Sequence, residues 1–137
     1  MPEIKWEDKF SVGVKELDEQ HKKIIEIINR LTAMDSAADF SGEEILKILR
    51  ELNDYAHYHF TNEEIYFREF DYPKAESHIR EHKKYRRKIK TLKDDYSVEQ
   101  KKRIIADLLG FIDDWWINHI NHADKEYTEC FHQHGLY

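Results

Sequence analysis

The chain has 137 residues, of which 40% are hydrophobic and 36% are charged, and its formal net charge is -6 at pH 7. This length suits a single domain with one hydrophobic core. The mixture of acidic and basic residues argues against a nucleic-acid surface, and no apolar run or signal-peptide pattern indicates membrane insertion or classical export. The single cysteine, Cys130, fits a reducing compartment, so we expect a cytoplasmic protein.

The predicted elements are almost entirely helical, because four glycines and two prolines are too few for the turns of an all-β fold. Apolar residues recur at steps of three and four, which predicts an N-terminal arm and four helices, over residues 1–16, 17–34, 41–70, 73–94 and 97–131. Ser41 with Glu44 forms a capping box that opens the second helix. Ser97 with Gln100 forms another at the fourth helix, and Pro73 suits the first turn of the third. The sequence therefore predicts an all-α protein, a single antiparallel up-down four-helix bundle with an arm.

Nine histidines are the unusual feature of the composition. Five of them and two acids follow the predicted inner faces of the helices: His21, His59, Glu63, His78, His82, His119 and Asp124. In "HIREH" two imidazoles lie four residues apart, so both leave the same helix face, and "HFTNE" gives an imidazole and a carboxylate the same spacing. Neutral imidazole with carboxylate suits iron, zinc or manganese.

Taken singly, each of these histidines is explained as well by ordinary packing or surface exposure. Together they are not, because five inward imidazoles are costly to bury unless a cation binds them. Seven donors suit two metal ions bridged by the two acids, and the five nitrogens then divide into three and two. If both metals are six-coordinate, the two-histidine metal lacks a ligand, and a vacant position is typical of a working site.

These motifs resemble those of the hemerythrin family, specifically the bacterial single-domain hemerythrins. The resemblance rests on "DEQH", "HFTNEE", "YP" followed by "HIREH", "HINHAD" and the opening "WEDKFSVGVKELDEQH", and it covers essentially the whole chain. It implies a non-haem di-iron site in a four-helix bundle. Carried over by position, it implies that one iron is held by three histidines, the other by two, and that two acids bridge them: His78, His82 and His119; His21 and His59; Glu63 and Asp124.

The resemblance also implies an oxo or hydroxo bridge and reversible binding of dioxygen, as hydroperoxide, at the open position of the two-histidine iron. No substrate is consumed, so the leading interpretation is an oxygen carrier or store and not an enzyme. We expect a monomer, with an oxygen-consuming protein as the partner for delivery. Two alternatives stay open: an oxygen or redox sensor module, and a di-iron oxidase or peroxidase. The enzyme is the weaker of these, because such enzymes use more carboxylates.

Helical spacing and the family pattern disagree within "HINHADKE". His122 and Glu126 are four residues apart, whereas His119 and Asp124 are five apart, which leaves them ~140° apart around an ideal helix. Because the resemblance selects His119 and Asp124, we predict that the helix is locally distorted there, as by a π-bulge.

The segment "WWINHI" supplies Trp115, Trp116 and Ile120, which we expect to line the oxygen pocket. The family usually has leucine where this chain has Trp116. Our hypothesis is that Trp116 narrows the cavity beside the open iron and slows oxidation, although core packing explains this residue equally well.

Several polar residues lie next to the predicted ligands in the sequence. We expect His57 to face solvent, since it is roughly 200° from His59 around the helix, and Glu64 to be a solvated residue. Asp18 and Glu81 are candidates for orienting ligand imidazoles, although ordinary surface charge explains both equally well.

Overall fold

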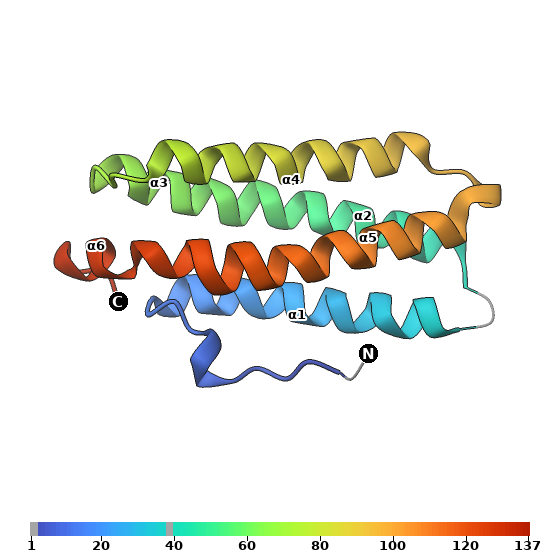
Figure 1. The fold of residues 1–137 in the computed structure, drawn as a ribbon, viewed down its shortest axis with the longest axis horizontal. Helices are drawn as coiled ribbons and strands as arrows, with labels where there is room; N and C mark the ends of the chain where they lie inside the picture. The colour runs from blue at the N-terminus through green and yellow to red at the C-terminus, as the bar shows by residue number, and fades with distance from the viewer. Residues whose placement is uncertain (1–2, 38–39) are drawn as a thin grey trace.

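The structure is a computed structural model that describes residues 3–37 and 40–137. Its main helices are α1 Lys15–Ser36, α2 Gly42–Tyr55, α3 Thr61–Glu69, α4 Ala75–Asp95, α5 Lys101–Trp115 and α6 Thr128–Gln133. They form an antiparallel up-down four-helix bundle with an N-terminal arm beside α1, which confirms the predicted fold class (Figure 1). Among the described residues, no helix has the length and apolar composition needed to cross a bilayer.

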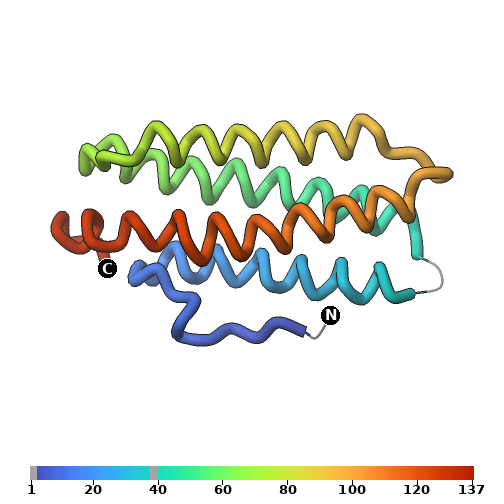
Figure 2. The backbone as a smooth tube through the Cα atoms, in the orientation of Figure 1, coloured from blue at the N-terminus to red at the C-terminus, as the bar shows by residue number. Residues whose placement is uncertain are grey.

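Two of the four rods of the bundle are composite. α2 continues into α3 through a π-helical segment, η2 (Ala56–Phe60), and α5 continues into α6 through a second one, η4 (Trp116–Ala123), and a 3-10 turn, η5 (Asp124–Tyr127). The rod of α5 and α6 lies beside α1, and the rod of α2 and α3 lies beside α4 (Figure 2). Each rod therefore crosses the full length of the bundle.

All four rods begin at residues other than the expected ones: α1 begins at Lys15, two residues before the expected start, and α2 begins one residue after Ser41. Ser41 does cap α2, since its Oγ accepts a hydrogen bond from the Glu43 backbone N–H at 3.1 Å. The capping box at Ser97 was wrong: its side chain makes no cap bond, and a 3-10 turn, η3 (Val98–Gln100), comes before α5. The start of α4 at Pro73 was also two residues early, because Asp71 has a positive φ of 53° and the turn that it forms delays the helix.

Buried apolar side chains form two separate clusters along the bundle axis. The main cluster contains most of the buried residues of α1, α2, α4 and α5, for example Ile28, Leu52, Ile89 and Leu108. The end cluster is smaller and consists of Val12, Val14, Leu17, Phe67, Tyr72, Tyr127 and Phe131. Every rod passes from one cluster to the other, and the polar inward-facing residues lie in the layer between them.

The arm is fixed to the bundle by polar contacts. Ile4 exchanges two hydrogen bonds with the Asn29 side chain, at 2.9 and 2.8 Å. Asp18 accepts from the Ser11 hydroxyl at 2.5 Å and from the Val12 backbone N–H at 2.8 Å. Asp18 therefore anchors the arm, and no imidazole is among its hydrogen-bond partners in the described part of the chain.

The arm also contacts the last turns of the chain. Thr128 Oγ1 donates to the Val12 carbonyl at 2.5 Å, and His132 Nε2 lies 2.7 Å from the carbonyl oxygen of Gly13. Lys125 donates to the carbonyl of Lys9. The last helical turns are thus held by the arm.

We predict opposite effects for two glycine-to-alanine substitutions. Gly13 has a φ of +77°, and an added Cβ would lie 2.8 Å from Thr128 Cγ2 and 2.9 Å from His132 Nε2. Gly13→Ala should therefore lower the free energy of unfolding by roughly 1–3 kcal/mol. Gly110, within α5, has no atom within 4 Å of its added Cβ, so Gly110→Ala should raise that free energy by about 0.5–1 kcal/mol. Urea unfolding of both variants measures the difference, and equal effects would contradict the role of Gly13.

Candidate metal centre

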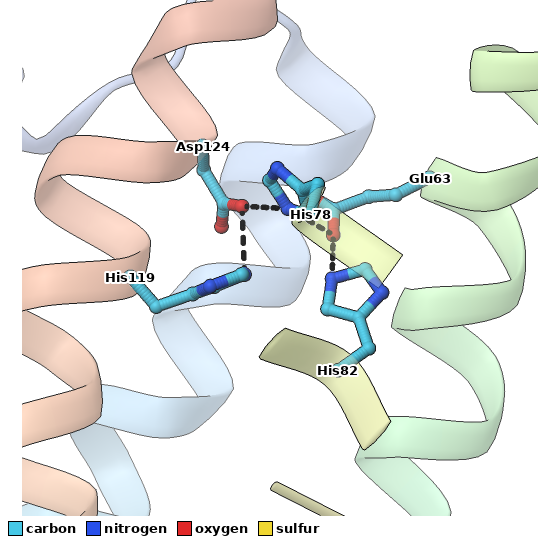
Figure 3. A group of neighbouring side chains, drawn as sticks. All are labelled: Glu63, His78, His82, His119 and Asp124. Atoms are coloured by element: carbon cyan, nitrogen blue, oxygen red, sulfur yellow. Dashed lines mark ion pairs between the residues drawn. The ribbon is translucent and has the colours of Figure 1, made fainter. Parts of the chain in front are cut away.

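The seven histidines and acids singled out in the sequence converge between the two apolar clusters. Their exposed fractions are all between 0% and 3%. They come from all four rods: His21 from α1, His59 and Glu63 from η2 and α3, His78 and His82 from α4, and His119 and Asp124 from η4 and η5. Figure 3 shows five of these side chains pointing toward one another from three of the rods.

The donor atoms fall into two groups that share both acids. The three-histidine group is made of His78, His82 and His119 with Glu63 and Asp124, and the two-histidine group is made of His21 and His59 with the same two acids. Within each group, the ligand atoms all lie within 4.8 Å of one another. The seven residues therefore form two adjoining sites with the acids between them.

Asp124 reaches both groups. Its Oδ1 lies 2.8 Å from His78 Nε2 and 3.0 Å from His119 Nε2, contacts that are dashed in Figure 3. Its Oδ2 lies 2.9 Å from His21 Nε2. One carboxylate thus faces imidazoles from three rods.

Glu63, on the rod of α2 and α3, also lies between the two groups. Its Oε1 is 3.1 Å from His82 Nε2, and its Oε2 is 3.3 Å from His59 Nε2. The buried hydroxyl of Tyr127 donates to Glu63 Oε2 at 2.7 Å. Tyr127 therefore fixes the orientation of this carboxylate.

The inner polar atoms fit a bound cation. Among the described residues, Glu63 Oε1, both Asp124 oxygens and the Nε2 atoms of His78, His82 and His119 are buried without a hydrogen bond, although they lie within ion-pair distance of one another. Buried polar atoms in such numbers are costly unless they bind something. Imidazole nitrogens and carboxylate oxygens are donors for borderline metals, so this set suits metal ions between them.

The pKa values of the buried histidines and acids also indicate a site that favours positive charge. Burial lowers the pKa of His78, but the close contacts of its ring with the carboxylates of Asp124 and Glu63 outweigh this effect and raise that pKa to about 10. Burial raises the pKa of Glu63, but the charge of His59 and close contacts with His78 and His82 hold it well below its usual range. Without metal, a proton on an imidazole therefore takes the place of a cation beside the carboxylates.

The rod that carries His119 and Asp124 is distorted, as predicted. It is π-helical over Trp116–Ala123 and tightens to a 3-10 turn at Asp124. The hydrogen bonds of a π-helix join residues five apart, and this wider turn brings His119 and Asp124 to one face. His122 and Glu126, the pair favoured by ideal spacing, lie at the surface, where the His122 side chain is 80% exposed and its Nε2 is 3.9 Å from the glutamate.

A second π segment, η2, carries His59 and was not predicted. His57 on the same segment is exposed, as expected. No glycine or proline marks this distortion in the sequence. Each of the two π segments thus carries one of the candidate metal ligands, His59 on η2 and His119 on η4.

The outward nitrogens of three histidines have side-chain partners. His82 Nδ1 is 2.8 Å from Glu64 Oε2, and His119 Nδ1 is 3.0 Å from Glu81 Oε1. Glu81 therefore contacts a candidate ligand, which agrees with the interpretation that it orients a ligand imidazole. The expectation that Glu64 is a solvated neighbour was wrong, because its side chain is 20% exposed and turned toward α4. Gln20, which the sequence analysis missed, has its Oε1 2.5 Å from His59 Nδ1.

Aromatic rings cover the imidazoles. Trp115 stacks on His119 with ring centroids 3.8 Å apart, and Tyr55 stacks on His59 at 5.0 Å. Trp115 therefore covers the three-histidine group, while Tyr55, which the sequence analysis missed, covers the two-histidine group. Trp116 is buried, with its ring 5.0 Å from that of Phe10 in the arm. Ile120 is also buried, and its place in an oxygen pocket with Trp115 and Trp116 stays a prediction.

Comparison with known proteins shows which family has this sequence pattern. The family model described as "Hemerythrin HHE cation binding domain" matches residues 12–130. The chain belongs to the hemerythrin family. It is similar to a bacteriohemerythrin of Clostridium acetobutylicum, with 30% identity over 127 residues that cover 90% of this chain and 98% of the relative. It is also similar to a hemerythrin-like protein of Naegleria gruberi, with 34% identity over 89% of this chain and 88% of the relative.

Solved structures agree with this assignment. A crystal structure of a hemerythrin with a leucine-to-alanine substitution matches with a TM-score of 0.74 and 32% identity, over 95% of this chain and 98% of that one. Membership of the hemerythrin family and the buried histidines and acids together support a di-iron site.

Proposed function

We propose that this hemerythrin-family protein binds dioxygen reversibly at a non-haem di-iron centre and serves to store or deliver oxygen. The observation that carries the proposal is the unequal division of the buried donors. Both acids are shared, but one group has three imidazoles and the other has two. With equal coordination numbers, the two-histidine half has one more position free for an exogenous ligand.

Each half of the centre has its own residues in this proposal. One iron would be held by His78, His82 and His119, the other by His21 and His59, with Glu63 and Asp124 bridging both. When bound, the iron pair would supply the electrons that dioxygen takes up on binding and gives back on release.

The surrounding residues keep this chemistry reversible. Apolar clusters close the layer on both sides, and the donors are at most 3% exposed, so bulk water is excluded. The stacked ring of Tyr55 covers His59, and Tyr127 holds one oxygen of Glu63.

Anaerobic loading with iron(II), followed by alternating exposure to air and to argon, tests the proposal. We expect a visible absorption band that appears in air and disappears under argon over several cycles. Irreversible bleaching, or consumption of an added reducing substrate at a steady rate, would support an oxidase or peroxidase in its place. The cytoplasmic location, the monomeric state and the oxygen-consuming partner stay predictions.

Metal uptake should release protons. His78 has a pKa raised to about 10 in the absence of metal, so it is protonated at pH 7, and its Nε2 must lose that proton to bind a cation. Uptake should release at least about one proton per protein at pH 7, and the apparent affinity should fall as the pH is lowered. Adding zinc(II) to the apoprotein in weakly buffered indicator solution measures this, with His122→Ala as a control that should release as many. Uptake without proton release would contradict the role of His78.

A further inference from the structure

The two halves of the centre differ in the partners of their outward nitrogens. In the three-histidine group, His82 and His119 each face a carboxylate, Glu64 at 2.8 Å and Glu81 at 3.0 Å. In the two-histidine group, His59 faces the neutral amide of Gln20. The Nδ1 atom of His21 is buried without a hydrogen-bond partner among the described residues.

This difference changes how strongly each imidazole donates to a metal. A carboxylate accepts a stronger hydrogen bond from Nδ1–H than an amide oxygen does, because it carries a full negative charge. The bond fixes the tautomer that leaves the Nε2 lone pair facing inward, and it increases the basicity of the ring. Both effects favour the half that contains His82 and His119.

Glu64 and Glu81 differ in their exposure to solvent. The side chains are 20% and 41% exposed, respectively. Since water screens the more exposed charge, Glu64 should have the larger effect.

We infer that Glu64 and Glu81 are positioning residues that make the three-histidine half the tighter half of the centre, so that the first metal ion enters there and the last one leaves from there. This inference rests on the proposed pair of metal ions. The three-histidine half also has one imidazole more than the other half, and this additional ligand strengthens metal binding there as well. Variants must therefore separate the effect of the two carboxylates from the effect of the third imidazole.

Titration of the apoprotein with cobalt(II) tests the order of binding. Cobalt(II) suits the same donors as iron(II), and its unpaired electrons shift the proton resonances of the imidazoles that it binds. The first equivalent should shift the ring protons of His78, His82 and His119, and the second those of His21 and His59. Shifts that begin with His21 and His59 would overturn the inference.

Three substitutions and one control isolate the carboxylates. Glu64→Gln keeps an acceptor but removes the charge, and it should weaken the first binding step about 10–100-fold while leaving the second nearly unchanged. Glu81→Gln should act in the same direction by a smaller factor. Gln20→Glu should strengthen the second step and bring the two affinities closer. Glu76→Gln removes the same charge from a side chain of α4 that is 91% exposed, and it should titrate like the parent.

The possible results separate this inference from the proposed function. If the parent binds fewer than two cobalt ions, the di-metal centre itself is wrong, and this inference is wrong with it. If two ions bind but Glu64→Gln, Glu81→Gln and Gln20→Glu all titrate like the parent, the centre stands and only the inference is overturned. Should Glu64→Gln fail to fold, Glu81→Gln and Gln20→Glu decide between these results.

Discussion

The Asp124→Asn variant should retain less than one iron ion per protein after anaerobic loading and desalting, where the parent retains two. The Asp124 carboxylate lies within 3.0 Å of His21, His78 and His119, so it serves both groups. Loss of an outer hydrogen-bonding partner typically costs 10–100-fold in metal affinity, and loss of a shared ligand should cost at least about 100-fold. Iron analysis and the absorption band that appears in air measure the effect.

Glu126→Gln is the matched control for this variant. Glu126 lies two residues further along the same rod, is 33% exposed and contacts Lys74 and His122 at the surface. This variant should retain two iron ions and the oxygen-dependent band. Full loading of Asp124→Asn would contradict the role of Asp124 as a shared ligand, and loss of iron from Glu126→Gln would indicate that the centre uses the pair favoured by ideal helical spacing.

Removal of the metal ions should lower the thermal unfolding midpoint by roughly 10–20 °C, because a ligand at 1,000 times its dissociation constant stabilises the folded state by about 4 kcal/mol. The inward face of α4 explains this dependence, since His78 and His82 occupy two of its five buried positions. Circular dichroism at low temperature should change little, because the two apolar clusters remain. Thermal scans with and without a chelator measure the shift.

Two controls complete this experiment. Addition of iron(II) under argon should restore the original midpoint, and the chelator should leave the midpoint of Asp124→Asn unchanged. A parent protein with the same midpoint before and after removal of its iron would contradict a metal centre that contributes to folding.

Most of the bundle could be predicted from the sequence because its helices are ordinary ones. The stripe through Ile24, Ile28 and Leu31 has the spacing of a regular helix, and the structure buries all three side chains. His78 and His82 lie four residues apart on α4, an undistorted helix, so their common face follows from spacing alone.

The distorted rods could not be predicted in this way. Ideal helical geometry places residues four apart together, so it selected His122 and Glu126, and only the family pattern indicated His119 and Asp124. The π segment gives residues five apart a common face. The π segment at His59 was not predicted, because His59 and Glu63 are four residues apart and this spacing already suits a regular helix. Nothing in the sequence therefore indicated a distortion there.

The partners of the imidazoles could not be predicted because they depend on packing between rods. Glu64 is rotated ~100° from Glu63 around the helix, a direction that faces solvent on an isolated helix. In the bundle, α4 lies on that side, and Glu64 meets His82. Gln20 meets His59 across the boundary of α1 and η2 in the same way.

The contacts between the arm and the last turns of the chain have a consequence for biosynthesis. Lys125, Thr128 and His132 hold a segment made more than a hundred residues earlier, and Asp124 comes just before them. A chain in which only α1, α2, α3 and α4 have folded has Glu63, but it lacks His119 and the second shared acid, Asp124. The pair of ions should therefore be held only after the rod of α5 and α6 has packed against α1, and a product that ends before His119 would expose its other histidines without one imidazole and one shared acid of the centre.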